Sequence, residues 1–178
     1  MTKTIITKKA LAAAASLMLL AAPLSMHAES TGSNSLSGNV SQTTPNTIII
    51  NSISTVRSNG TADGTFENGW MWVFDITTPL NEQNLMMKFD NWLSLNTPNT
   101  TIPVANNVRF YSNQSSNAFN QNSAVYITAA NVYSTNMFLT GNLGAQQGMR
   151  RVQITVEMRI PQGSTQGTYT TNFGIKTQ

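Results

Sequence analysis

The sequence predicts an all-β protein, an antiparallel β-sandwich of seven or eight strands, and three observations lead to this fold class. Apolar residues alternate with polar ones in several segments, as they do when one face of a strand is buried. Stretches rich in Gly, Asn and Pro separate these segments. No stretch beyond the N-terminal region shows the apolar stripe of an amphipathic helix. A closed barrel is the alternative arrangement of such strands.

The segment Val152–Ile160 shows the clearest strand pattern, because its apolar residues all fall on one side and Gln, Thr, Glu and Arg fall on the other. Trp70–Ile76, Leu85–Phe89 and Tyr169–Ile175 repeat the alternation, and each predicts a strand with one buried face. Shorter or weaker strands are expected at Ile48–Val56, Val108–Tyr111, Val125–Ile127 and Met137–Leu139.

The N-terminus reads as a cleavable secretion signal. Lys3, Lys8 and Lys9 form a basic start, the run Ala10–Leu24 is almost entirely apolar, and Ala28 offers a small residue before a cleavage site. The apolar run is shorter than the roughly 20 residues that span a bilayer, which favours a cleaved signal over a membrane anchor. We therefore expect a secreted or cell-surface protein that is not attached to the membrane after cleavage.

Three parts of the chain follow from this: a signal peptide at 1–28, an arm rich in Ser, Gly, Asn and Thr at 29–46, and a β-sandwich domain at 47–178. Loss of the signal lysines leaves equal numbers of basic and acidic residues, so no basic excess favours nucleic acid as a partner. The chain has no cysteine, and a domain of this size can fold by burial without disulfides.

The arm is too polar to bury much surface, so we expect it to be flexible. Leu36 and Val40 are its only larger apolar residues. They would be the anchors if the arm adds as a strand to the open sheet edge of a neighbouring copy or of another surface protein. A plain linker and a disordered tail are the alternatives.

Catalysis is not expected. The only histidine is His27, inside the signal, which excludes Ser-His-Asp and Cys-His nucleophiles from the mature chain, together with zinc and copper sites built on imidazole or thiolate. A hydrolase using the carboxylates of Asp75 and Asp90 is a remote alternative. Both side chains are expected to point outward from alternating strands, where carboxylates are ordinary.

The segment 59–67 is the candidate cation site. It places oxygen-bearing side chains at every other position, with Asp63 and Glu67 as the carboxylates, and such spacing can surround calcium. A hairpin turn built on Asn-Gly and Asp-Gly is the alternative. No other cofactor is indicated.

The aromatic residues suggest a second kind of site. Trp70 and Trp72 share a strand face with Phe74 and are assigned to the core, whereas Trp92 lies in phase with Lys88 and is expected to be exposed if that strand is regular. Together with Tyr111 it would offer a glycan or peptide a stacking surface.

The segment Val152–Thr177 resembles the closing hairpin of secreted bacterial immunoglobulin-like surface domains. The residues that carry the match are Ile160, Pro161, Gly163, Gly167, Tyr169 and Gly174. The resemblance implies an immunoglobulin-like sandwich with a cell-surface or extracellular role, in some cases in pilus-like filaments, and it transfers no catalytic residue. Unlike disulfide-bearing pilins assembled by chaperones, this chain has no cysteine. We therefore expect a non-catalytic structural or adhesive protein that self-assembles through its arm, with a carbohydrate- or peptide-binding module as the alternative.

Overall fold

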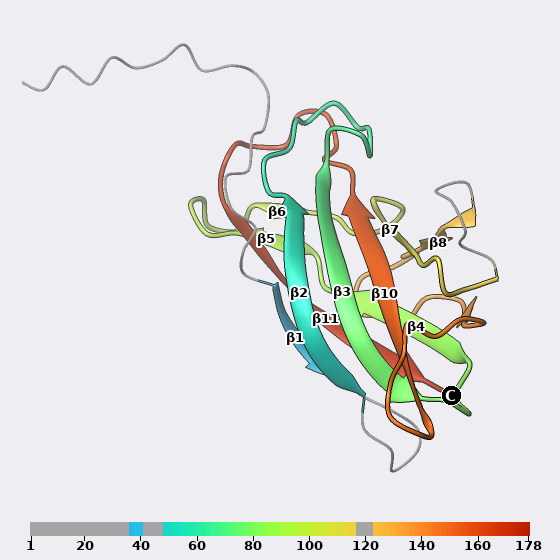
Figure 1. Cartoon of the computed structure of the whole chain (residues 1–178). Helices are drawn as coiled ribbons and strands as arrows, with labels where there is room; N and C mark the ends of the chain where they lie inside the picture. The colour runs from blue at the N-terminus through green and yellow to red at the C-terminus, as the bar shows by residue number, and fades with distance from the viewer. Residues whose placement is uncertain (1–35, 41–47, 117–122) are drawn as a thin grey trace, which may run out of the picture.

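The computed structural model describes residues 36–40, 48–116 and 123–178, and in these ranges the chain is all-β, without an α-helix (Figure 1). The two sheets pair their strands antiparallel, with one parallel exception at the N-terminal strand. The signal peptide and its cleavage site at Ala28 lie outside the described residues, as does the arm apart from residues 36–40. No helix in the described ranges is long and apolar enough to cross a membrane.

We call the five-stranded layer sheet B, and its strand order is β2-β3-β10-β7-β8. The bounds are β2 Ile49–Arg57, β3 Trp70–Pro79, β7 Val108–Tyr111, β8 Val125–Tyr126 and β10 Met149–Met158. The two long strands β3 and β10 pair along their whole length at its centre, which confirms both alternating segments as strands.

The second layer, sheet A, has the order β6-β5-β11-β4-β9, and β1 pairs with β11 in addition. The bounds are β1 Leu36–Val40, β4 Asn84–Phe89, β5 Trp92–Ser94, β6 Thr101–Ile102, β9 Met137–Phe138 and β11 Tyr169–Thr177. Several of these strands are only two or three residues long, so the described ranges hold more strands than the alternation predicts.

The core lies between the sheets. Trp70, Trp72 and Phe74 of β3 are at most 1% exposed, and Met87 and Phe89 of β4 are fully buried from the other layer. Alternation with one face toward the partner sheet is the reason, because side chains at every second position point into the sandwich.

A β-bulge at Asp90–Asn91 joins β4 to β5. Both strands pair with the same strand, β11, but the step from Phe89 to Leu93 contains one residue more than the step from Thr170 to Phe173. One extra residue reverses the side to which all following side chains point. The expectation that Trp92 is exposed is therefore wrong, since its exposed fraction is 0%.

Candidate functional site

The β11 edge is the first functional candidate. Phe173 to Ile175 pair with β4 and also with β1, so the two strands lie on opposite edges of β11. The register runs from Leu36 opposite Thr171 to Val40 opposite Ile175. The two residues predicted as arm anchors are thus the first and last residues of β1, and in this structure the edge that they occupy belongs to their own chain (Figure 1).

The outer strands of the two sheets are protected in different ways. A long strand with an open edge is a template for pairing with another chain. In sheet B the outer strand β2 has irregular register between Ile50 and Ser52 and again between Thr55 and Arg57, and such bulges make an edge a poor template. The pairing of β11 with β4 is regular, and the other edge of β11 receives an added strand instead.

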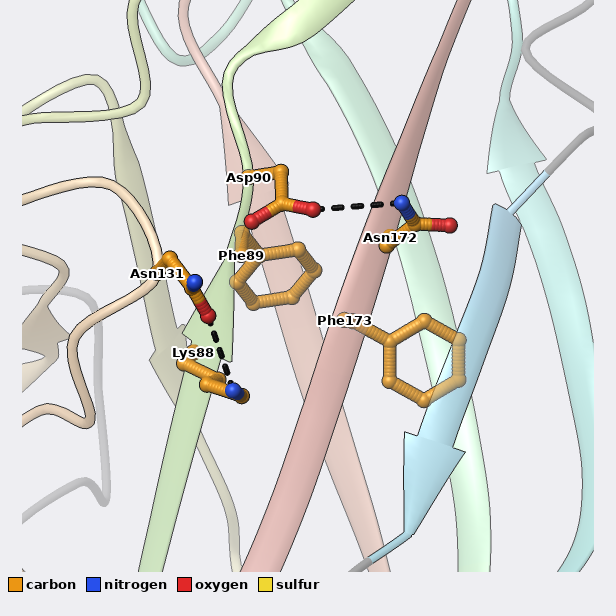
Figure 2. A pocket seen from close by; sticks show the side chains of 6 residues that line it. All are labelled: Lys88, Phe89, Asp90, Asn131, Asn172 and Phe173. Atoms are coloured by element: carbon orange, nitrogen blue, oxygen red, sulfur yellow. Dashed lines mark hydrogen bonds between the residues drawn. The ribbon is translucent and has the colours of Figure 1, made fainter.

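A polar groove on the outer face of sheet A is the second candidate. Figure 2 shows the six residues around its first hollow, of about 250 Å³: Lys88, Phe89, Asp90, Asn131, Asn172 and Phe173. An adjoining hollow of about 340 Å³ shares two of them and is lined by Asp90, Asn91, Leu93, Thr101, Thr170, Thr171 and Asn172. We call the two hollows together the outer-face groove.

Hydrogen bonds between β4, β11 and the loop before β9 hold the groove in shape. Asn172 Nδ2 donates to Asp90 Oδ2 at 3.1 Å, and Thr171 Oγ1 donates to the Asp90 carbonyl at 2.7 Å. From the loop, the Asn131 N–H donates to the Phe89 carbonyl at 2.8 Å, while Asn131 Oδ1 accepts from Lys88 Nζ at 2.8 Å. Asn131 has a φ of 56°, a left-handed conformation that asparagine tolerates better than most residues.

Both lysines of the described ranges lie on this face. Lys88 Nζ is 5.3 Å and Lys176 Nζ is 4.8 Å from the centre of the Tyr133 ring, which attracts both cations through its negative face. These contacts hold both ammonium groups beside one ring, but only Lys88 lines the outer-face groove.

The carboxylates of Asp75 and Asp90 are not brought together. Asp75 faces outward from β3 in sheet B and is covered by Arg151, whose Nε and Nη2 donate to its two oxygens at 2.8 and 2.6 Å. Asp90 lies on the outer face of the other sheet. The Arg151 guanidinium, with help from Asn51, holds the pKa of Asp75 well below its ordinary value despite burial. Asp75 is a structural ion-pair residue in this arrangement.

Asp75→Asn is expected to lower the free energy of unfolding at neutral pH by about 1–2 kcal/mol, because Arg151 loses a charged acceptor but remains half exposed. The folded-state pKa of Asp75 lies below its unfolded value of about 3.9, so its stabilisation is complete above that pH and declines as the pH falls further. Urea unfolding at a series of pH values checks this. A difference between the wild type and Asp75→Asn that stays constant down to pH about 2 contradicts it.

The candidate calcium loop lies between β2 and β3, and hydrogen bonds to Asp63 organise it. Asp63 Oδ1 accepts from the N–H and the hydroxyl of Thr65 at 2.8 Å each, and Oδ2 accepts from Asn68 Nδ2 at 2.6 Å. The bonds from Asn68 and Thr65 lower the pKa of Asp63, while Glu67 is exposed. In the described part of the chain, no group of three or more His, Cys, Asp or Glu residues is placed to hold a metal ion.

The predicted aromatic platform does not form. Trp92 lies in the core, where its ring stacks on Trp72 at 5.1 Å with planes 12° apart. Tyr111 lies on the outer face of sheet B, half-buried, where its hydroxyl donates to Glu157 Oε1 at 3.2 Å. The two rings therefore belong to different regions, and the interpretation of both as one ligand surface is wrong.

Asn131 and Asn172 line the groove but are not among the site residues that the sequence predicts. Asn172 could have been predicted, because it lies on the outward-facing side of a predicted strand. Asn131 could not have been predicted, because it belongs to a loop without alternation, and only the folded chain brings it to the end of β4. Neither a protein-family model nor a curated protein matches this sequence.

Proposed function

We propose that this chain is a secreted, immunoglobulin-like subunit of an extracellular assembly, and that its copies join when the arm of one copy pairs with the β11 edge of the next. The observation that supports this most is the five-residue pairing of β1 with β11. A strand added to a sheet edge binds mainly through backbone hydrogen bonds, so a polar arm can serve. The export signal and the neutral mature chain agree with this role.

The same pairing can be made within one chain or between two chains, because the backbone groups are identical in both cases. β1 belongs to sheet A, whereas β2, the next strand of the chain, belongs to sheet B, so β1 makes no hairpin with its neighbour in sequence. An exchanged arm creates a head-to-tail contact in which each copy donates one arm and accepts another. Such a contact extends into filaments unless its rotation closes a ring.

Disulfide trapping tests the proposal cleanly, because the chain has no cysteine of its own. Ser37 lies opposite Asn172 in the register, and adjacent strands about 4.8 Å apart bring such partners within the range that a disulfide spans. We expect a preparation with Ser37→Cys, mixed with one carrying Asn172→Cys and oxidised, to give a mixed disulfide dimer. The chain with both substitutions should give a ladder of covalent multimers on a non-reducing gel.

Thr140→Cys in place of Asn172→Cys is the matched control, since Thr140 is exposed and lies in no strand paired with β1. It should give far less mixed dimer. Removal of residues 29–46 should convert the multimers of the unmodified chain into monomers in size-exclusion chromatography. A double-cysteine chain that forms only an internal disulfide at every protein concentration overturns the proposal.

A further inference from the structure

We propose that the outer-face groove is a binding site for a neutral glycan, whose adjacent hydroxyl groups are held between Asp90 and Asn131. This inference does not depend on the proposed function, because the groove is lined by the β4–β5 bulge, β11, β6 and the loop before β9. A copy without its arm therefore keeps the side chains in question.

The groove has both a hydrogen-bond acceptor and hydrogen-bond donors that are available to a ligand. Asp90 accepts from Asn172 through Oδ2 only, which leaves Oδ1 without a hydrogen bond in the described part of the chain. Asn131 uses its oxygen to accept from Lys88, so its two amide N–H groups are available as donors, and Asn91 likewise uses its oxygen to accept from Val104 N–H at 3.1 Å. Figure 2 shows that the carboxylate oxygen of Asp90 that does not accept from Asn172 is turned toward Asn131.

This set of groups suits a sugar. Each hydroxyl group both donates and accepts, so two adjacent hydroxyls are satisfied by a carboxylate oxygen beside an amide N–H. Leu93, 46% exposed, provides an apolar wall for the C–H face of a ring in the adjoining hollow. The hollows, of about 250 and 340 Å³, lie near the lower end of small-ligand pockets, for which about 300–1,000 Å³ is typical.

The charge of the groove favours a neutral ligand over an acidic one. Lys88 and Asp90 are its only charged lining residues among the described ones, and they balance each other. An acidic glycan would face the Asp90 carboxylate across the same hollow, which disfavours it.

The groove differs from an ordinary solvated strand face because its polar side chains are fixed before any ligand arrives. Asp90 is tied to β11 through Asn172, and Asn131 is tied to β4 through its backbone N–H and its side chain. Groups that are already held in place lose little conformational entropy when they bind.

The test is a titration of the isotope-labelled chain without its signal peptide, followed by NMR, with maltotriose, mannotriose and triacetylchitotriose as neutral probes and trigalacturonate as the acidic one. We expect at least one neutral trisaccharide to shift the amide signals of Asn91, Asn131 and Asn172, with a Kd near 1 mM, as suits an open groove. Asp90→Asn should weaken this binding at least tenfold. The substituted side chain still offers Asn172 an acceptor, so the fold is preserved.

Asn131→Gly is the second variant, because glycine accepts the left-handed backbone and removes only the amide group. It too should weaken binding at least tenfold. Glu67→Gln, an exposed carboxylate change outside the groove, is the control and should leave the Kd unchanged. The inference is overturned if no neutral probe shifts these signals at about 10 mM, if Asp90→Asn binds as well as the wild type, or if only trigalacturonate binds.

Discussion

Trp92→Ala is expected to lower the free energy of unfolding by about 3–5 kcal/mol, the range for removal of a fully buried large aromatic side chain. Its ring contacts both Trp70 and Trp72, with centroids 5.1 Å away in each case, and Trp70 in turn packs on Tyr169 at 5.8 Å. Alanine would leave a cavity between the two sheets that these rings cannot fill without moving. Urea unfolding followed by fluorescence of the remaining tryptophans measures the change.

Leu93→Ala is the matched control, because Leu93 is the next residue along the strand and is 46% exposed. It should cost less than about 1 kcal/mol. Trp92→Phe should be milder than Trp92→Ala, since the Trp92 Nε1 has no hydrogen-bond partner in the described part of the chain and phenylalanine keeps most of the packing. If Trp92→Ala lowers the free energy of unfolding no more than Leu93→Ala does, the β-bulge is absent and Trp92 lies on the exposed side of its strand.

The contrast between Phe89 and Trp92 shows where sequence reasoning succeeds and fails. Alternation identifies β3, β4, β10 and β11 because each is long enough for several apolar side chains to repeat on one face. A bulge adds one residue without any change in composition, so the pattern before Asp90 gives no warning of the reversal after it. Because of this one extra residue, Trp92 lies in the core, although the alternation predicts it at the surface.

The strand β1 marks a second limit. Its sequence, Leu-Ser-Gly-Asn-Val, has little apolar content, and composition therefore predicts flexibility for the whole arm. Pairing with β11 depends on backbone N–H and C=O groups, which every non-proline residue carries. The sequence of a strand added to a sheet edge can thus give almost no indication that it forms a strand. The indication comes instead from the partner strand, if one of its edges is unpaired.

Loops that fold over a sheet are the third limit, and Glu157 is the example. It lies in the polar phase of β10, where alternation predicts exposure, yet it is 2% exposed. Arg109 from β7 covers it, and the ring of Phe66, from the loop between β2 and β3, packs on the Arg109 guanidinium with its centroid 3.9 Å away. The alternation within β10 does not predict that side chains of a distant loop cover this face of the strand.

Glu157→Met is expected to lower the free energy of unfolding by about 3–5 kcal/mol, because it removes the carboxylate that balances the nearly buried charge of Arg109. Arg109 Nε and Nη2 both lie 2.7 Å from Glu157 Oε2, and the Tyr111 hydroxyl donates to the other oxygen. Removal of this last bond in Tyr111→Phe should cost only about 0.5–1.5 kcal/mol, although the acceptor is a carboxylate, because the bond is long at 3.2 Å.

The double variant Arg109→Met with Glu157→Met separates the ion pair from simple packing. Each single change leaves one charge unmatched, whereas the double change removes both and keeps apolar bulk against Phe66. We therefore expect the double variant to be more stable than Glu157→Met alone, with a coupling energy above about 1 kcal/mol in a double-mutant cycle. Costs of the two single changes that simply add would mean that the pair is solvated, and that the loop carrying Phe66 does not cover this face of sheet B in solution.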